Sequence, residues 1–280
     1  MTKMKGMKNF RKYRKYKKYL EVFRMSFKMQ IVWRFDVAMT AVAVVTRVAA
    51  AWLLWSAVYM GRDMVGGFTF EAMLSYYIVS SIIGSIDFSN QVSGEVSQLI
   101  RDGGFSKHMV TPINPIGFFG AIVGGESAYH LGFSLLAAAL CAVMFHQGIN
   151  LTADVSRILP AIVMMLLGLA FMVGYHFFVG VMTFQFMNIE FFLILQGDVI
   201  RFATGSLIPL SLLPGSVAAA LKFLPFTHVV YTPAMLLAGQ MSAREGMFGL
   251  CVIAAWAVGM LTVAWQAYGR LRVRYDGVGI

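Results

Sequence analysis

Apolar runs long enough to cross a lipid bilayer recur along almost the whole of this 280-residue chain. A helix needs about 20 such residues to cross the hydrocarbon core of a membrane. Hydrophobic residues make up 59% of the chain and charged residues only 13%, and the mean hydropathy is +0.71. This balance lies far outside that of soluble domains. The sequence therefore predicts an all-α integral membrane protein with no sizeable soluble domain.

Basic residues gather at the start of the chain. Twelve of the 23 Lys and Arg residues lie within the first 34 positions, and the formal net charge is +10. Such a block resists translocation and is attracted to anionic lipid, so we expect a cytoplasmic N-terminus that contacts membrane lipids rather than nucleic acid. One helical face of this region carries apolar side chains: Tyr16, Leu20, Phe23, Phe27 and Ile31.

That pattern predicts that residues 1–34 form a basic tail and an amphipathic helix in the membrane interface. An amphipathic helix packed on protein would show the same pattern. Residues 35–280 are predicted to form a six-helix transmembrane domain in the inner (cytoplasmic) membrane, with far more Lys and Arg inside than outside and both termini in the cytoplasm. The expected spans cover residues 37–60, 72–90, 116–145, 160–186, 190–208 and 247–268, with a tight turn near Asn188.

Two of these boundaries rest on proline. Pro160 stands where the fourth span is expected to begin, in the first-turn position that proline favours. Four of the seven prolines crowd together before the last span, at Pro209, Pro214, Pro225 and Pro233. Irregular backbone survives at membrane depth only where protein or trapped water covers it, so segment 205–245 is predicted to form re-entrant half-helices that enter from the outer face.

The polar segment 91–115 is the most informative loop. Val92, Val96, Leu99 and Ile100 recur at helical spacing, and Gly103 with Gly104 ends the pattern as a C-cap does. We expect a short amphipathic helix parallel to the membrane, on which a cytoplasmic partner can push. A plain surface turn between two spans explains the same residues equally well.

At this point the chain resembles a known family. The order from Glu95 through Ile100, Arg101 and Gly103 to Pro112 resembles the loop after the second span in permease subunits of type-2 ATP-binding-cassette (ABC) exporters. The four prolines of segment 205–245 are similar to the family's segment before its last span, and they stand in the runs Leu-Ile-Pro-Leu, Leu-Leu-Pro, Leu-Pro-Phe and Tyr-Thr-Pro.

The resemblance implies half of a transporter, in which two permease chains pair and each docks on a cytoplasmic ATPase. It assigns the ATPase contact to one stretch of the loop: Glu95, Leu99, Ile100, Arg101, Asp102, Gly103, Gly104 and Phe105. It makes the four clustered prolines the outer gate. The chain lacks the glycine-rich phosphate loop of ATPases, so we expect no enzymatic activity and no cofactor here, with ATP and Mg on the partner ATPase.

Ionisable residues inside the spans form a second set of candidates. Arg47 and Glu126 both lie about 15 Å from the expected inner face, and we predict that they pair, with His130 one helical turn away from Glu126. Asp198 and Arg201 are three residues apart and can satisfy each other. Asp87 is expected near the inner end of the second span. These charges either lock helices together or line the substrate route.

Two other function classes stay open. A secondary transporter driven by an ion gradient would use Asp87, Glu126 or Asp198 as proton carriers. A lipid-modifying membrane enzyme would need clustered polar residues at one leaflet, and the inner loop shows no metal-like spacing.

Cys141 and Cys251 fall within apolar runs and are interpreted as core residues.

Overall fold

The computed structural model describes residues 2–32, 34–87, 89–144, 151–186, 189–206 and 208–274, and these residues form helices joined by turns. The ends expected at Phe145 and Asn188 lie outside the described residues. The α-helices are α1 (Thr2–Val32), α2 (Arg34–Val58), α3 (Phe70–Ser85), α4 (Asn90–Arg101), α5 (Ser106–Val110), α6 (Pro115–Met144), α7 (Val155–Val181), α8 (Glu190–Ala203), α9 (Gly215–Leu221), α10 (Tyr231–Leu237) and α11 (Ala243–Leu271). Short 3-10 helices are η1 (Met182–Phe184), η2 (Leu210–Leu212), η3 (Phe226–His228) and η4 (Arg272–Arg274).

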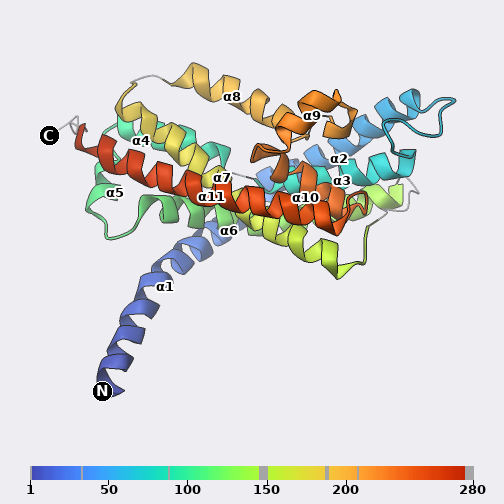
Figure 1. Ribbon diagram of the computed structural model, residues 1–280. Helices are drawn as coiled ribbons and strands as arrows, with labels where there is room; N and C mark the ends of the chain where they lie inside the picture. Colours follow the sequence, from blue (N-terminus) through green and yellow to red (C-terminus); the bar gives the residue numbers. More distant parts are fainter. Residues whose placement is uncertain are drawn as a thin grey trace.

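The long helices run side by side as one elongated bundle (Figure 1). One end of the bundle carries α4, α5 and the last turns of α11, and we call it the α5 end. The opposite end carries α9 and the loop between α2 and α3, and we call it the α9 end. Helix α1 leaves the bundle obliquely, with its N-terminus far from the packed helices (Figure 1).

Four helical stretches of the described chain are long and apolar enough to cross a membrane, and a bent pair of short helices gives up to a fifth. The four are Ala38–Val58, Phe70–Arg101, Val155–Phe184 and Ala243–Leu271. The prediction of a polytopic helical membrane protein is therefore confirmed, but the structure does not establish six spans. Helix α8 has 14 residues, about 21 Å of helix, which is shorter than the roughly 30 Å hydrocarbon core.

Helix α4 does not lie across the end of the bundle, as the sequence led us to expect. It continues the path of α3, and the two together form the candidate span Phe70–Arg101. The amphipathic pattern itself is confirmed, because Val92, Val96 and Ile100 are buried. The apolar face packs on α7, and an added Cβ on Gly180 would lie only 2.7 Å from the Cβ of Val96. The lever parallel to the membrane was therefore a wrong prediction for this helix.

Helix α1 packs along the first half of α6. The Ser26 hydroxyl donates to the carbonyl of Ile122 at 2.9 Å, and Phe27 meets the edge of Tyr129. At the crossing point, an added Cβ on Gly125 would lie 2.5 Å from the Phe23 carbonyl oxygen. Small residues let helix backbones approach this closely in membranes. On the face expected to be apolar, Phe23 and Phe27 are half-buried on protein, whereas Tyr16, Leu20 and Ile31 are exposed.

Helix α7 is the central element, since it contacts α4, α10 and α11. It begins five residues before Pro160, so the prediction that this proline opens the helix was wrong. Asp154 is the N-cap instead, accepting hydrogen bonds from the Ser156 backbone N–H and hydroxyl at 2.9 and 2.8 Å. These two bonds favour the carboxylate and lower the pKa of Asp154.

The buried side chains form two main clusters, one toward each end. The cluster at the α9 end includes Tyr76, Met164, Phe171, Leu236 and Ile253. The cluster at the α5 end includes Val96, Phe105, Phe119, Phe177 and Tyr268. Residues of α7 belong to both clusters, so this helix connects the two ends of the bundle.

The proline-rich segment is broken into short helices, as predicted. The pair Gly215–Leu221 and Phe226–Leu237 bends by 80° at its break, as in a broken span or a re-entrant loop. The segment starts at Gly205, whose positive φ of 75° suits glycine. The Gly205 carbonyl accepts a hydrogen bond from the buried Tyr76 hydroxyl at 2.7 Å, which attaches the segment to α3.

Candidate functional site

The loop that follows α4 is held to the bundle by its backbone. Gly103 has a φ of 77°, a left-handed conformation that allows the chain to reverse after Arg101. The Phe105 backbone N–H then donates to the Leu99 carbonyl at 2.9 Å. The expected glycine-terminated helix end is therefore present, and it leads directly into α5.

Phe105 anchors this loop in the core of the α5 end. Its side chain is fully buried, and its ring meets the rings of Phe184 and Tyr268 edge-on, with centroids 5.5 and 6.0 Å apart. Phe184 belongs to η1 after α7, and Tyr268 lies near the end of α11. The loop therefore touches the ends of two membrane-spanning helices through one aromatic side chain.

The residues assigned to ATPase contact divide into two groups. Ile100 and Phe105 are buried, while Leu99, Gly103 and Gly104 are half-buried. Glu95, Arg101 and Asp102 are exposed. Of the assigned residues, the second group therefore presents the most surface to a partner.

The sequence reasoning missed Val110, whose side chain is 83% exposed at the end of α5. Lys107 and Thr111 beside it are also exposed. The signal in the sequence was an apolar pair, Met109 and Val110, within a polar turn. We call residues 101–112 the end loop.

An ion pair connects the end loop to α8. The Arg101 guanidinium donates to Glu190 Oε1 at 2.7 Å. The two side chains are 37% and 59% exposed, so solvent screens the pair and its contribution to stability is small. The pair positions the first turn of α8 beside the end loop.

His108 lies in an aromatic environment within the end loop. Its ring lies 5.4 Å from that of Phe105, 5.0 Å from that of Phe118 and 5.6 Å from that of Phe119. Burial, together with the positive charge of Lys107, lowers the pKa of His108. The neutral imidazole is therefore the form that suits the docked loop.

Asp87 makes a local contact just before α4. Its carboxylate accepts hydrogen bonds from the Ser89 backbone N–H at 3.0 Å and from the Ser89 hydroxyl at 2.5 Å. These two bonds hold the Asp87 carboxylate beside Ser89, the residue before the first turn of α4.

The structure does not bring Arg47 and Glu126 together. Among the described residues no ion pair joins them. Arg47 lies on α2 beside α3, with a guanidinium nitrogen 3.8 Å from an ideal Cβ position on Gly84, and the charge of Arg201 on α8 acts on it. Sequence depth alone gave no information about which face of its helix each of the two residues occupies.

Glu126 and His130 instead meet α1. Glu126 lies on α6 within electrostatic reach of Ser26 on α1 and of Glu95 on α4. The Nε2 atom of buried His130 lies 3.3 Å from the Gln30 side-chain oxygen. These groups therefore help to position α1 on α6.

Asp198 and Arg201 form the expected ion pair on α8. The Arg201 guanidinium lies 3.6 Å from the Asp198 carboxylate. Both side chains are largely exposed, at 80% for Asp198 and 68% for Arg201. The pair faces outward from the single chain instead of packing between its helices.

The four predicted gate prolines occupy different environments. Pro209, Pro225 and Pro233 are buried, and Pro214 is exposed at the start of α9. Pro233 lies in the first turn of α10, where a missing N–H costs no helical hydrogen bond. His228 reinforces the segment, with Nε2 2.9 Å from the Lys222 carbonyl oxygen and Nδ1 2.8 Å from the Thr232 hydroxyl.

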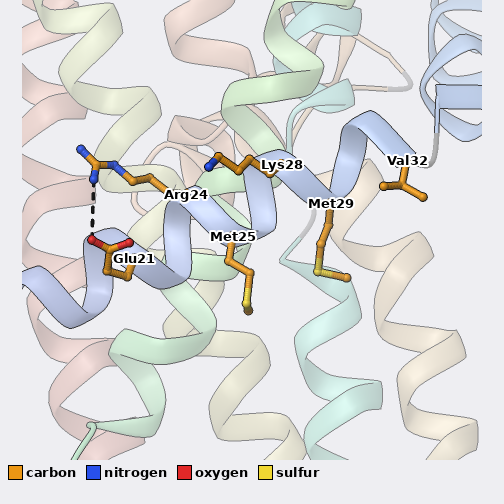
Figure 2. A pocket seen from close by; sticks show the side chains of 6 residues that line it. All are labelled: Glu21, Arg24, Met25, Lys28, Met29 and Val32. Atoms are coloured by element: carbon orange, nitrogen blue, oxygen red, sulfur yellow. Dashed lines mark ion pairs between the residues drawn. The ribbon is translucent and has the colours of Figure 1, made fainter.

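The described surface includes two open grooves. A groove of about 520 Å³ runs along α1 and is lined by Glu21, Arg24, Met25, Lys28, Met29 and Val32. Figure 2 shows the Glu21 and Arg24 side chains paired along α1 and the two methionines directed to the same side. A groove of about 460 Å³ lies between α6, α7 and α11 and is mostly apolar. Within the described chain, no group of His, Cys, Asp and Glu is arranged to hold a metal ion.

Comparison with known proteins agrees with this architecture. A family model described as "ABC-2 family transporter protein" matches residues 45–277, which covers α2 beyond its first turns and every later helix. Neither the curated proteins nor the solved structures give a match to the chain. The matched region contains the end loop, the intramembrane charges and the proline-rich segment. The chain therefore belongs to the ABC-2 family of transporter proteins, as an ABC-2 type permease.

Proposed function

We propose that this permease is the translocation subunit of an exporter and is driven by separate cytoplasmic ATPase subunits that contact the end loop. The observation that carries the proposal is the position of Phe105. It links a loop with exposed Arg101, Lys107 and Val110 to the buried ends of two spans. A partner that displaces the end loop would therefore displace η1 and α11 with it.

The distribution of charge supports a cytoplasmic location for the α5 end. Arg101 and Lys107 lie in the end loop, Arg270 lies at the end of α11 and Arg272 begins η4. Lys and Arg are retained on the cytoplasmic side of membrane proteins. Both termini would then be cytoplasmic, in the inner (cytoplasmic) membrane, and the proline-rich segment at the α9 end would form the outer gate.

We place the free face of α1 in the membrane interface. Met25, Met29 and Val32 are 52%, 51% and 76% exposed, and Arg24 and Lys28 flank them (Figure 2). Apolar side chains flanked by basic ones are typical of helices that lie at the headgroup level. The opposite face of α1 is already covered by α6.

A second permease chain would cover other exposed apolar side chains. On α8 these include Phe191, Ile194 and Val199, which are 79%, 73% and 60% exposed. Helix α8 is too short to cross the membrane alone, and its polar pair at Asp198 and Arg201 faces outward. A second chain packed against α8 would cover this apolar face and shield the Asp198–Arg201 pair from lipid.

Cross-linking tests the ATPase contact. We would replace Cys141 with Ala and Cys251 with Ser, and then introduce Val110→Cys in a tagged permease purified from native membranes. We expect a cross-link from the thiol introduced at position 110 to a co-purifying ATPase, with orthovanadate-sensitive ATP hydrolysis in the same preparation. Met64→Cys is the matched control, because Met64 is 59% exposed at the opposite end of the bundle. A cross-link from position 64 and none from position 110, or a preparation without ATP hydrolysis, would contradict the proposal.

A further inference from the structure

Three exposed charged side chains, one on α2 and two on α8, interact through their charges. They are Arg47 on α2 and Asp198 and Arg201 on α8, and we call them the mid-membrane cluster. Arg201 and Asp198 are 3.6 Å apart, and the charge of Arg201 acts on Arg47. All three side chains are exposed.

The depth of the cluster follows from its neighbours. Arg47 lies 11 residues before the end of α2 at Val58, about 17 Å along the helix. It lies beside Gly84, which is 14 residues after the start of α3, about 21 Å along that helix. The end of α2 and the start of α3 both lie at the α9 end, so Arg47 is near the middle of a hydrocarbon core about 30 Å thick.

Charge does not balance within the cluster. Two guanidinium groups face one carboxylate, and among the described residues no carboxylate makes an ion pair with Arg47. An uncompensated arginine at mid-membrane costs about 2.5–3.5 kcal/mol on insertion scales. Ionisable residues at this depth normally face a protein interior or a water-filled route. The face that carries the cluster is therefore not a lipid-facing surface in the working transporter.

The side chains around the cluster are apolar. Val199 and Phe202 on α8 are 60% and 43% exposed, and Leu54, two turns after Arg47 on α2, is 57% exposed. Guanidinium groups bind carboxylates, phosphates and sulfonates through two parallel hydrogen bonds, and bind them more tightly where water is scarce. The surface thus combines excess positive charge with apolar walls.

We propose that the mid-membrane cluster binds the anionic group of an amphipathic substrate, with Arg47 as the principal contact and the apolar side chains of α2 and α8 against its body. This assignment rests on the proposed export function, since the same face would line the route between the two permease chains. Arg201 stays partly neutralised by Asp198, which leaves Arg47 to make the stronger contact with the anion.

A pair of fluorescent probes with the same ring system tests the proposal. 1-Anilinonaphthalene-8-sulfonate carries one anionic group, and N-phenyl-1-naphthylamine carries none. Binding of each probe and probe-stimulated ATP hydrolysis would be measured on the permease–ATPase complex in phosphatidylcholine nanodiscs. We expect Arg47→Gln to weaken binding of the sulfonate about tenfold and to leave binding of the neutral probe within twofold. Arg47→Lys should keep most of the sulfonate affinity.

The control variant is Arg62→Gln. Arg62 is exposed in the loop at the α9 end, so this variant should bind both probes as the wild type does. Adding phosphatidylglycerol to the nanodiscs identifies the source of the anion. Competition with the sulfonate assigns the cluster to an anionic lipid, and no competition assigns it to a non-lipid amphiphile. Both outcomes support an anion site.

Two results would overturn the inference. One is an equal loss of binding affinity for both probes in Arg47→Gln. The other concerns the second permease chain. If Arg47→Gln no longer co-purifies with a second permease chain and the double variant Arg47→Asp/Asp198→Arg does, the cluster forms an ion pair between two copies of the chain. A preparation that contains no ATPase would instead contradict the proposed function and is recognised before any probe is added.

Discussion

Gly180 on α7 and Val96 on α4 are in direct contact, with 2.7 Å between the Cβ of Val96 and the position that a Cβ on Gly180 would occupy. The backbone carbonyl of Ser93 lies 3.0 Å from the same position. Only a residue without a side chain allows α4 to pack this closely on α7.

The first prediction concerns this contact. Gly180→Ala should destabilise the protein by about 1–3 kcal/mol, because overpacking forces the two helices apart. Gly94→Ala is the matched control on α4, since nothing lies within 4 Å of its added Cβ. This variant should be neutral or slightly stabilising, because alanine favours helix over glycine. Thermal unfolding in detergent measures both, and equal midpoints for the two variants would contradict the close contact.

The second prediction concerns the α1–α6 crossing. Gly125→Ala places a methyl group 2.5 Å from the Phe23 carbonyl oxygen and 3.0 Å from the Phe27 nitrogen. Because both atoms are backbone, α1 has to move away, and trypsin should cut faster at Arg24 and Lys28. Gly132→Ala on the same helix meets nothing within 4 Å and should be cut at the wild-type rate. Unchanged proteolysis of Gly125→Ala would show that α1 does not dock there.

The third prediction compares two contacts of the end loop. Phe105→Ala removes a fully buried ring and should cost about 3–5 kcal/mol. Arg101→Gln removes an exposed ion pair and should cost less than about 1 kcal/mol. The unfolding midpoints in denaturant rank the two variants. A larger effect for Arg101→Gln would mean that the ion pair, and not the aromatic anchor, holds the loop.

The fourth prediction is a pH dependence of loop docking. In the docked loop the pKa of His108 is lowered, whereas in an undocked loop His108 would have the ordinary histidine pKa of about 6.5. The undocked form therefore binds more protons, and docking should weaken as the pH falls below about 6.5. Hydrogen exchange across residues 101–112 should speed up more between pH 7.5 and 5.5, after correction for intrinsic rates, than it does in His108→Asn. The same change in both proteins would exclude His108 as the cause.

Composition and periodicity predicted the class of the molecule and several of its parts. The helix at Asn90–Arg101, its glycine end at Gly103 and the broken segment after Gly205 all follow from local preferences of the backbone. Apolar periodicity found the buried face of α4 for the same reason. These features depend on residues close together in the sequence.

The errors concern relations between distant segments. Sequence spacing showed that α4 is amphipathic but not that Gly180 leaves room for it against α7. It placed Arg47 and Glu126 at similar depths but could not show that they occupy different faces of the bundle. Pro160 was assigned to the wrong position because the capping by Asp154 starts α7 five residues earlier. Proline is tolerated there inside a membrane helix, since neighbouring groups can compensate for the lost hydrogen bond.

The attachment of α7 at both of its ends has a kinetic consequence. Near its first turns, Arg157 donates to the Gly239 carbonyl at 2.9 Å and the Thr152 backbone N–H donates to the Leu237 carbonyl at 2.9 Å. Beyond its last turn, Phe184 meets Phe105. One continuous rod about 40 Å long thus joins both sides of the membrane. We expect the two sides to change conformation in a single concerted step, so that time-resolved labels on residues 110 and 240 should report the same rate constant.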